Sequence, residues 1–223
     1  RKCAFKGKVV ALYQKTEPML WTGREDKGDR FFNKVKVVDL LKDEFPSSSK
    51  SDLSFALLGF CCDVGVRRNQ GRVGAKEGPL ALRNALRNKC FHNFEDVTLF
   101  DCGDVICEDD DLEGAQQLLG EKVDLILQKG HFPIVLGGGH SISWGHYQGL
   151  ERTELSESLG VINIDAHYDL RPLLKDGKGS SGTPFLQIAE RRKENKLPFH
   201  YLCLGVQESA NTTPLFETAK DLG

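Results

Sequence analysis

The chain has 223 residues, 39% of them hydrophobic, which suits a single α/β domain with a sizeable core. Its formal net charge is −2 and its basic residues are scattered, so neither nucleic acid nor an anionic membrane is an expected partner. No apolar run approaches the about 20 residues of a membrane-spanning helix, and no secretory signal opens the chain, which starts at Arg1. Seven cysteines without a CxxC pair predict mostly buried, reduced thiols in a cytoplasmic protein.

Residues 1–52 are predicted to form an N-terminal extension or lid, and residues 53–223 an α/β domain. The extension contains one expected helical stretch, at residues 32–45, and a Ser-rich connector at residues 47–51.

From residue 53 onward, predicted strands and helices alternate. The strands are continuous apolar runs, which indicates burial on both faces, as in a parallel sheet between helices. The predicted fold is therefore a three-layer α/β/α arrangement with a mostly parallel central sheet. In chain order, the predictions are a strand at 54–60, a Gly-rich loop at 64–78, a helix at 79–89, a strand at 97–100, a helix at 112–128, a strand at 132–136, a helix at 141–150, a strand at 160–164, a helix at 183–193, a strand at 201–204 and a helix at 213–222.

Three potential metal ligands directly follow the strand at 160–164. Asp165, His167 and Asp169 occupy alternate positions, so in an extended chain they point to one side. Two carboxylates and one imidazole favour an oxygen-preferring ion such as Mn²⁺ over a structural zinc. The alternative is that Asp165 caps a turn and His167 is a polar surface residue.

A fourth potential ligand, His140, follows the strand at 132–136 after three glycines. Ligands bind beyond the carboxyl ends of parallel strands, so His140 is expected at the same edge of the sheet as Asp165. A phosphate-binding loop is the competing interpretation of GGGHS, but no Lys follows the glycines as a P-loop requires. The sequence therefore predicts a metal site.

Two other groups of polar residues receive structural interpretations. The acidic run at residues 109–111 is interpreted as solvated surface or a helix N-cap. His146, on the helix after GGGHS, is interpreted as packed or exposed rather than catalytic.

The motifs GGGHS (137–141) and DAHYD (165–169) resemble the ureohydrolase superfamily of arginase, agmatinase and formimidoylglutamase. Further segments resemble the formimidoylglutamase branch and together span most of the chain. They are LWTGRED (20–26), GFCCDVGVRRNQGRVGAKEGPLALR (59–83), SWGHYQGL (143–150), DLRP (169–172), SSGTPF (180–185) and GVQESANT (205–212).

This resemblance implies a hydrolase with two Mn²⁺ ions. His140 and Asp169 would hold one ion, Asp165 would bridge, and His167 would serve the other. The ions would lower the pKa of a water enough to supply a nucleophile, which Asp169 would orient before passing a proton toward the leaving amine. Arginases and agmatinases carry a His where Ser181 stands here, and this departure favours the formimidoylglutamase branch. The resemblance makes Ser181 a candidate catalytic residue.

The expected reaction is therefore hydrolysis of N-formimidoyl-L-glutamate to L-glutamate and formamide, in histidine breakdown. The alternatives are an agmatine or guanidino-acid hydrolase, and a metal-free, non-catalytic paralogue. The family supplies further ligands from a later Ser-x-Asp-x-Asp-like motif, and this chain ends at Gly223 before such a motif. We interpret the chain as part of a longer protein, and the resemblance also implies a homo-oligomer.

The substrate carries two carboxylates, so its site needs hydrogen-bond donors. Arg171, two residues after Asp169, offers a bidentate guanidinium, although a surface ion pair is an equal alternative. Asn69 and Arg72 lie in the Gly-rich loop and either bind substrate or fix the loop. Asn211, after the strand at 201–204, is a weaker candidate for substrate binding.

Overall fold

The computed structural model describes residues 3–5, 8–23, 29–42, 45–49, 52–92 and 96–223. The strands are β1 (Cys3–Phe5), β2 (Lys8–Gln14), β3 (Val35–Val37), β4 (Leu53–Cys61), β5 (Val97–Cys107), β6 (Phe132–Leu136), β7 (Gly160–Ile164) and β8 (His200–Leu204). The α-helices are α1 (Phe31–Lys34), α2 (Val64–Arg68), α3 (Gly78–Leu86), α4 (Leu112–Gln128), α5 (Ile142–Leu150), α6 (Pro184–Glu194) and α7 (Thr213–Leu222). Short 3₁₀ turns are η1 (Pro18–Leu20), η2 (Ala75–Glu77), η3 (Glu154–Ser158) and η4 (Glu208–Ala210).

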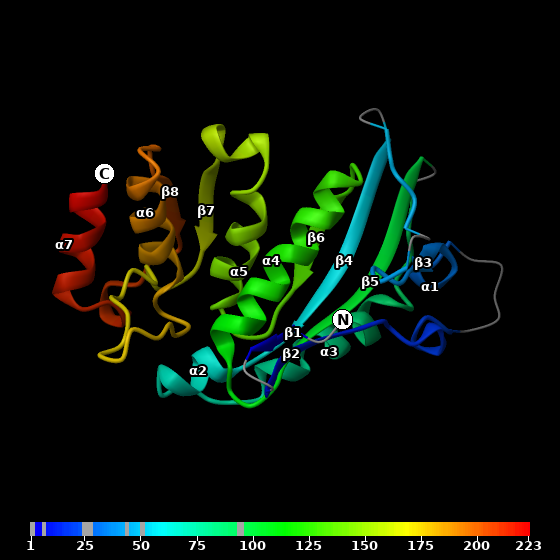
Figure 1. The fold of residues 1–223 in the computed structure, drawn as a ribbon, viewed down its shortest axis with the longest axis horizontal. Helices are drawn as coiled ribbons and strands as arrows, with labels where there is room; N and C mark the ends of the chain where they lie inside the picture. Colours follow the sequence, from blue (N-terminus) through cyan, green and yellow to red (C-terminus); the bar gives the residue numbers. More distant parts are fainter. Residues whose placement is uncertain (1–2, 6–7, 24–28, 43–44, 50–51, 93–95) are drawn as a thin grey trace.

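The described strands form two sheets (Figure 1). The larger sheet has the order β1-β2-β5-β4-β6, and β3 also pairs with β5. Strands β3, β4, β5 and β6 are parallel, whereas β1 and β2 are antiparallel additions at one edge. Strands β7 and β8 form a separate parallel pair. The predicted α/β fold with a mostly parallel sheet is confirmed, although β6 and β7 are not hydrogen-bonded to each other.

Strand β4 is buried on both faces, and this defines the layers. Ala56, Leu58 and Phe60 pack in one cluster with the apolar side of α4. The alternate residues Phe55 and Leu57 face the opposite cluster, which includes Leu86 of α3. Because side chains alternate along a strand, helices therefore cover both faces of the larger sheet, as the continuous apolar run predicts.

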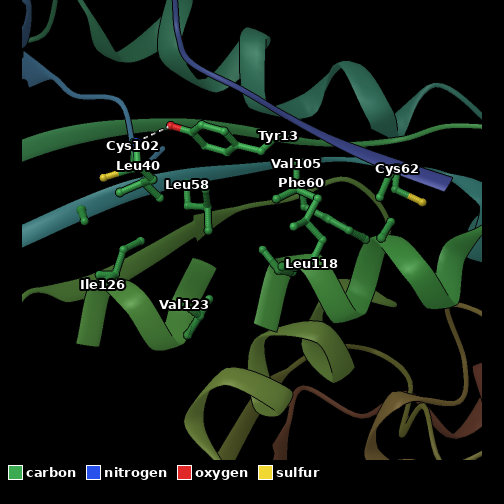
Figure 2. Close-up of a cluster of buried hydrophobic side chains, with 14 of the residues drawn as sticks. Tyr13, Leu40, Leu58, Phe60, Cys62, Cys102, Val105, Leu118, Val123 and Ile126 are labelled. Carbon is green, nitrogen blue, oxygen red and sulfur yellow. Dashed lines mark hydrogen bonds between the residues drawn. The ribbon is translucent and has the colours of Figure 1, made fainter. Parts of the chain in front are cut away.

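Figure 2 shows the cluster between the larger sheet and α4. Leu118 and Ile126 of α4 point toward the sheet, where Leu58 and Phe60 lie, and Val123 is buried in the same cluster. The spacing of these positions is that of an amphipathic helix. Burial of this apolar surface is the main stabilising contribution, at about 25 cal/mol per Å² removed from water.

The N-terminal segment also joins this core. Tyr13 of β2 is buried in the same cluster, and its hydroxyl accepts a hydrogen bond from Leu40 N at 2.9 Å (Figure 2). Burial raises the pKa of Tyr13, so the hydroxyl stays protonated.

A buried ion pair also fixes the N-terminal segment. Arg83 of α3 (1% exposed) donates two hydrogen bonds, each of 2.8 Å, to the carboxylate of Asp101 in β5 (0% exposed). Asp101 also accepts from Trp21 Nε1 at 2.7 Å and from Thr16 Oγ1 at 2.9 Å. The extra donors compensate for the desolvation of the carboxylate, so this network is favourable only while every member is present.

Three predictions in the first half of the chain are wrong. Residues 32–45 are not one helix, because in the described part of this segment the helix ends at Lys34 and Val35–Val37 instead pairs in parallel with β5. Residues 43–44 lie outside the described residues. Strand β5 continues to Cys107 rather than ending at residue 100, because β2 pairs with its second half. The predicted loop at 64–78 contains α2 and η2. The division of the chain at residue 52 stays a prediction.

In the second half, the predictions agree with the structure, and β6, β7, α4 and α7 have the predicted bounds. Among the described residues, no helix is both long and apolar enough to cross a bilayer. The cysteines whose side chains are described carry free thiols. They are Cys61, Cys62, Cys90, Cys102, Cys107 and Cys203.

Candidate metal centre

His140 lies in the loop between β6 and α5, and glycines allow this loop to approach the end of β4. Gly138 N donates to Phe60 O at 3.1 Å, and Gly139 N donates to Cys62 O at 2.9 Å. A Cβ atom on Gly138 would collide with both of these carbonyl oxygens, so only glycine fits there. The glycines therefore hold His140 at the carboxyl end of the parallel strands.

Asp165 and Asp169 come from the loop that follows β7. Asp165 Oδ1 accepts a hydrogen bond from His167 N at 2.9 Å, which closes a tight turn directly after the strand. Asp169 has a left-handed backbone, with φ of 48°. This conformation costs a residue with a side chain about 1 kcal/mol, and such strain is typical of functional sites.

These three side chains converge. His140 Nδ1 lies 3.0 Å from Asp165 Oδ2 and 2.7 Å from Asp169 Oδ2. One ligand atom from each residue lies within 4.8 Å of the others, the separation expected for groups that share a cation. The chemistry of an imidazole with two carboxylates fits Mn²⁺.

His167 lies in the same cavity but outside this cluster. Its side chain is 54% exposed, and its Nδ1 atom lies 3.2 Å from Asp165 Oδ1. The alternative interpretation of Asp165 as a turn residue is therefore compatible with metal binding, because one carboxylate oxygen serves the turn and the other faces His140.

The electrostatics of the cluster favour a positive charge between the carboxylates. Burial by itself lowers the pKa of His140, but the carboxylates of Asp169 and Asp165 outweigh it and raise this pKa above its ordinary value. The carboxylates that favour a proton on the imidazole would favour a metal cation in the same way. Binding of a metal would displace that proton.

The cluster lines a cavity of about 320 Å³. Ser181, Asn69 and Arg171 also line this cavity. Ser181 is placed there by its backbone, because Ser181 N donates to Gly65 O at 3.0 Å. The structure thus brings the predicted catalytic serine to the same cavity as the predicted metal ligands.

A second cavity, of about 540 Å³, adjoins the first, and Asn69 and Arg171 line both. Its walls also include Arg68 and Lys175. Glu113 binds Arg68 through two hydrogen bonds of 2.6 and 3.1 Å. Among the described residues no carboxylate pairs with Arg171, so its guanidinium is available to a ligand that spans the two cavities.

The remaining candidates line neither of these two cavities. Arg72 is exposed and lines neither of them. Asn211 contacts the loop of residues 165–169, called the ligand loop below. Its side-chain amide hydrogen bonds to the backbone of Ala166 and Tyr168. His146 is packed rather than paired, and burial lowers its pKa to about 4. Asp111 is the N-cap of α4, since its side chain accepts from Gly114 N at 2.9 Å.

Sequence reasoning missed the side chains that support the ligand loop, which include Asn163 and Tyr201. Asn163 Nδ2 donates to His167 O at 3.3 Å, and Tyr201 Oη donates to Tyr168 O at 2.8 Å. One signal was present in the sequence, because Asn163 is a lone amide inside the apolar run of β7. A buried amide requires hydrogen-bond partners, so an Asn at this position indicates that its side chain binds polar groups of a neighbouring segment.

Comparison with known proteins gives consistent results. The family model described as "Arginase family" matches residues 53–223. A formimidoylglutamase of Aeromonas salmonicida (strain A449) is 46% identical over 210 residues, covering 92% of this chain and 63% of the relative. A formimidoylglutamase of Legionella pneumophila (strain Lens) is 45% identical over 215 residues, covering 96% and 65%. The chain thus spans less than two thirds of the length of these relatives.

Solved structures show the same relationship. The crystal structure of Trypanosoma cruzi formiminoglutamase with Mn²⁺ has a TM-score of 0.68 and 33% sequence identity to this chain. The match covers 78% of this chain and 59% of that one. The formimidoylglutamase of Bacillus subtilis, at 22% identity and a TM-score of 0.67, supports the fold. By its sequence match and its fold, the chain belongs to the arginase family.

Proposed function

We propose that this chain carries part of the metal site of a manganese-dependent hydrolase acting on N-formimidoyl-L-glutamate. The observation that carries the proposal is the convergence of His140, Asp165 and Asp169 within 4.8 Å at one end of the parallel strands. The relatives named formimidoylglutamase and the Mn²⁺-containing formiminoglutamase structure support the choice of reaction and of metal.

His140 and Asp169 would hold one Mn²⁺, and Asp165 would share that ion with a second, served by His167. Bound Mn²⁺ lowers the pKa of water, which makes a nucleophile available near neutral pH. The two carboxylates offset the positive charge and set its position. Among the described residues there is one three-ligand cluster, so the count of two ions is part of the proposal.

The protein groups perform the proton transfers. Asp169 is the more buried of the two carboxylates, with 14% of its side chain exposed, compared with 23% for Asp165. A carboxylate held at this position orients the attacking water, accepts its proton and returns it to the departing amine of glutamate. Ser181 lines the same cavity. Its hydroxyl would hydrogen bond to the amidine end of the substrate.

The products would be L-glutamate and formamide. The amidine carbon would lie beside the metal ligands, in the cavity of about 320 Å³. The two carboxylates of the substrate would extend into the adjoining cavity of about 540 Å³. Arg171, shared by both cavities, would bind a carboxylate in a bidentate manner, and Asn69 would add a neutral hydrogen bond. Arg72 and Asn211 line neither cavity, so they are not included in the proposed substrate site.

An assay of the intact protein tests the proposal. The protein is loaded with Mn²⁺ and supplied in parallel with N-formimidoyl-L-glutamate, L-arginine and agmatine. Release of glutamate and formamide, with little urea, supports the proposal. Faster release of urea from arginine or agmatine would reassign the substrate, and metal analysis with no bound Mn²⁺ would favour the non-catalytic paralogue.

The biological setting remains a prediction. A role in histidine breakdown follows from the proposed substrate, and a cytoplasmic location is the interpretation of the free thiols. Assembly into a homo-oligomer follows from the family resemblance alone.

A further inference from the structure

The backbone of the ligand loop, residues 165–169, is held by a side chain from beyond β8. Asn211 Oδ1 accepts a hydrogen bond from Tyr168 N at 3.1 Å, and Asn211 Nδ2 donates to Ala166 O at 2.8 Å. The same Nδ2 group donates to Gln207 O at 2.8 Å. Asn211 thus spans the loop on both sides of His167, and its N–H donors are used within the protein.

A second support comes from the sheet. Tyr201 of β8 donates from its hydroxyl to Tyr168 O at 2.8 Å and accepts from Asn163 Nδ2 at 3.1 Å. Asn163 is 4% exposed, so this contact is shielded from water. Tyr168 is therefore fixed at both of its backbone polar groups, at N by Asn211 and at O by Tyr201.

Tyr168 directly precedes Asp169, whose backbone is left-handed. Such a conformation persists only where the surrounding structure determines it on both sides. On the far side, Asp169 O accepts from Phe185 N at 3.3 Å, and on the near side Tyr168 is held as described. The result is a carboxylate placed 2.7 Å from His140 Nδ1.

We propose that Tyr201 and Asn211 are positioning residues of the metal centre. By fixing Tyr168 they hold the Asp165 and Asp169 carboxylates toward His140 before an ion binds. In this proposal neither Tyr201 nor Asn211 touches the ion or the substrate. This inference rests on the proposed function, because it concerns the affinity of the same site for Mn²⁺.

A matched pair of hydroxyl deletions in the intact protein tests this. Tyr201→Phe removes only the hydroxyl that holds Tyr168. Tyr147→Phe is the control, because Tyr147 belongs to the same hydrophobic cluster and its hydroxyl is buried without a bond to the loop. Removing an outer partner of a metal ligand typically weakens binding about 10-fold to 100-fold, so we expect the Kd for Mn²⁺ to rise about 10-fold in Tyr201→Phe. In Tyr147→Phe it should change by less than about twofold.

Calorimetric titration with Mn²⁺ gives the first readout. If Tyr201→Phe binds Mn²⁺ as the parent does, or if both variants weaken it equally, the inference is overturned while the proposed function stands. Asn211→Ala should likewise raise the Kd, and Asn211→Gln should restore little of the loss, because a longer side chain displaces the amide from the loop.

Hydrogen exchange of the metal-free protein gives a second, independent readout. The amide of Tyr168 should exchange faster in Asn211→Ala and Tyr201→Phe than in the parent, with no change in Tyr147→Phe. If the parent binds no Mn²⁺, the proposed function fails. The hydrogen-exchange comparison then still tests, by itself, whether Tyr201 and Asn211 fix the loop at Tyr168. Unchanged exchange at Tyr168 would overturn the positioning role.

Discussion

His140 and Asp169 meet across two loops of the sheet, with 2.7 Å between the imidazole Nδ1 and a carboxylate Oδ2. One residue follows β6 and the other follows β7, and these strands are not hydrogen-bonded to each other. The contact therefore links the two described sheets at their carboxyl ends. A cation shared by these ligands would strengthen the same link, because it would neutralise the two carboxylates that face His140.

Loss of the imidazole should abolish tight metal binding. In His140→Ala we expect the Kd for Mn²⁺ to rise about 100-fold or more, beyond the effect of an outer partner, because a direct ligand is removed. His200→Ala is the control, since His200 is exposed and lies at the opposite end of β8 from the loop. Titration calorimetry of both variants checks this, and equal affinities would show that His140 is not a ligand.

Removal of the guanidinium between the two cavities should affect substrate binding. Arg171→Ala should raise KM for N-formimidoyl-L-glutamate by about 10-fold or more, because a hydrogen bond to a charged group contributes about 1.5–3 kcal/mol. Arg171→Lys should recover part of this loss but not the bidentate geometry. Steady-state kinetics beside Arg152→Ala, an exposed arginine away from both cavities, provide the comparison. A KM unchanged in Arg171→Ala would favour a surface role.

The buried ion pair of the fold should contribute to stability without contributing to metal binding. Arg83→Met leaves the Asp101 carboxylate buried without its cation, which should lower the free energy of unfolding by about 3–5 kcal/mol. Arg67→Met removes an exposed partner of Asp110 and should change the free energy of unfolding far less, because solvent screens an exposed ion pair. Urea unfolding measures both. Equal, small losses would mean that the Arg83 network adds little.

Acid sensitivity should depend in part on His146. Burial lowers its pKa from 6.5 to about 4, so the unfolded state binds the proton more tightly than the folded state. The stability due to neutral His146 is therefore complete above pH 6.5 and is lost as the pH falls toward 4. His146→Gln, which stays neutral, should show a smaller decrease in unfolding free energy over this interval. An identical pH profile in parent and variant would contradict the assignment, and His200→Ala serves as the control.

The sequence predicted much of the second half of the fold because its signals are local. Helix α4 combines an Asp111 cap with a continuous amphipathic pattern, and β6 and β7 are apolar runs bounded by glycine and polar residues. The N-terminal segment could not be predicted in this way. Val35 and Val37 form a strand because β5 offers a parallel edge, and that pairing is tertiary rather than local.

The convergence of the candidate ligands was predictable from the sequence, but the hydrogen bonds that support their loop were not. His140, Asp165 and Asp169 follow strand ends, and topology alone brings strand ends together. The hydrogen bonds from Asn211 and Tyr201 depend on side-chain directions in segments distant in sequence, which no spacing rule encodes. The direction of the Arg72 side chain was likewise not predictable. Arg72 lies in the Gly-rich segment predicted at the site, yet its side chain lines neither cavity.

A crystal structure of the intact protein with Mn²⁺, with diffraction data collected on both sides of the manganese absorption edge, would locate the ion. We expect an anomalous difference peak between His140 Nδ1 and the carboxylates of Asp165 and Asp169. A map with no peak there, or a peak held by other residues while these three side chains turn away, would contradict the proposed metal site.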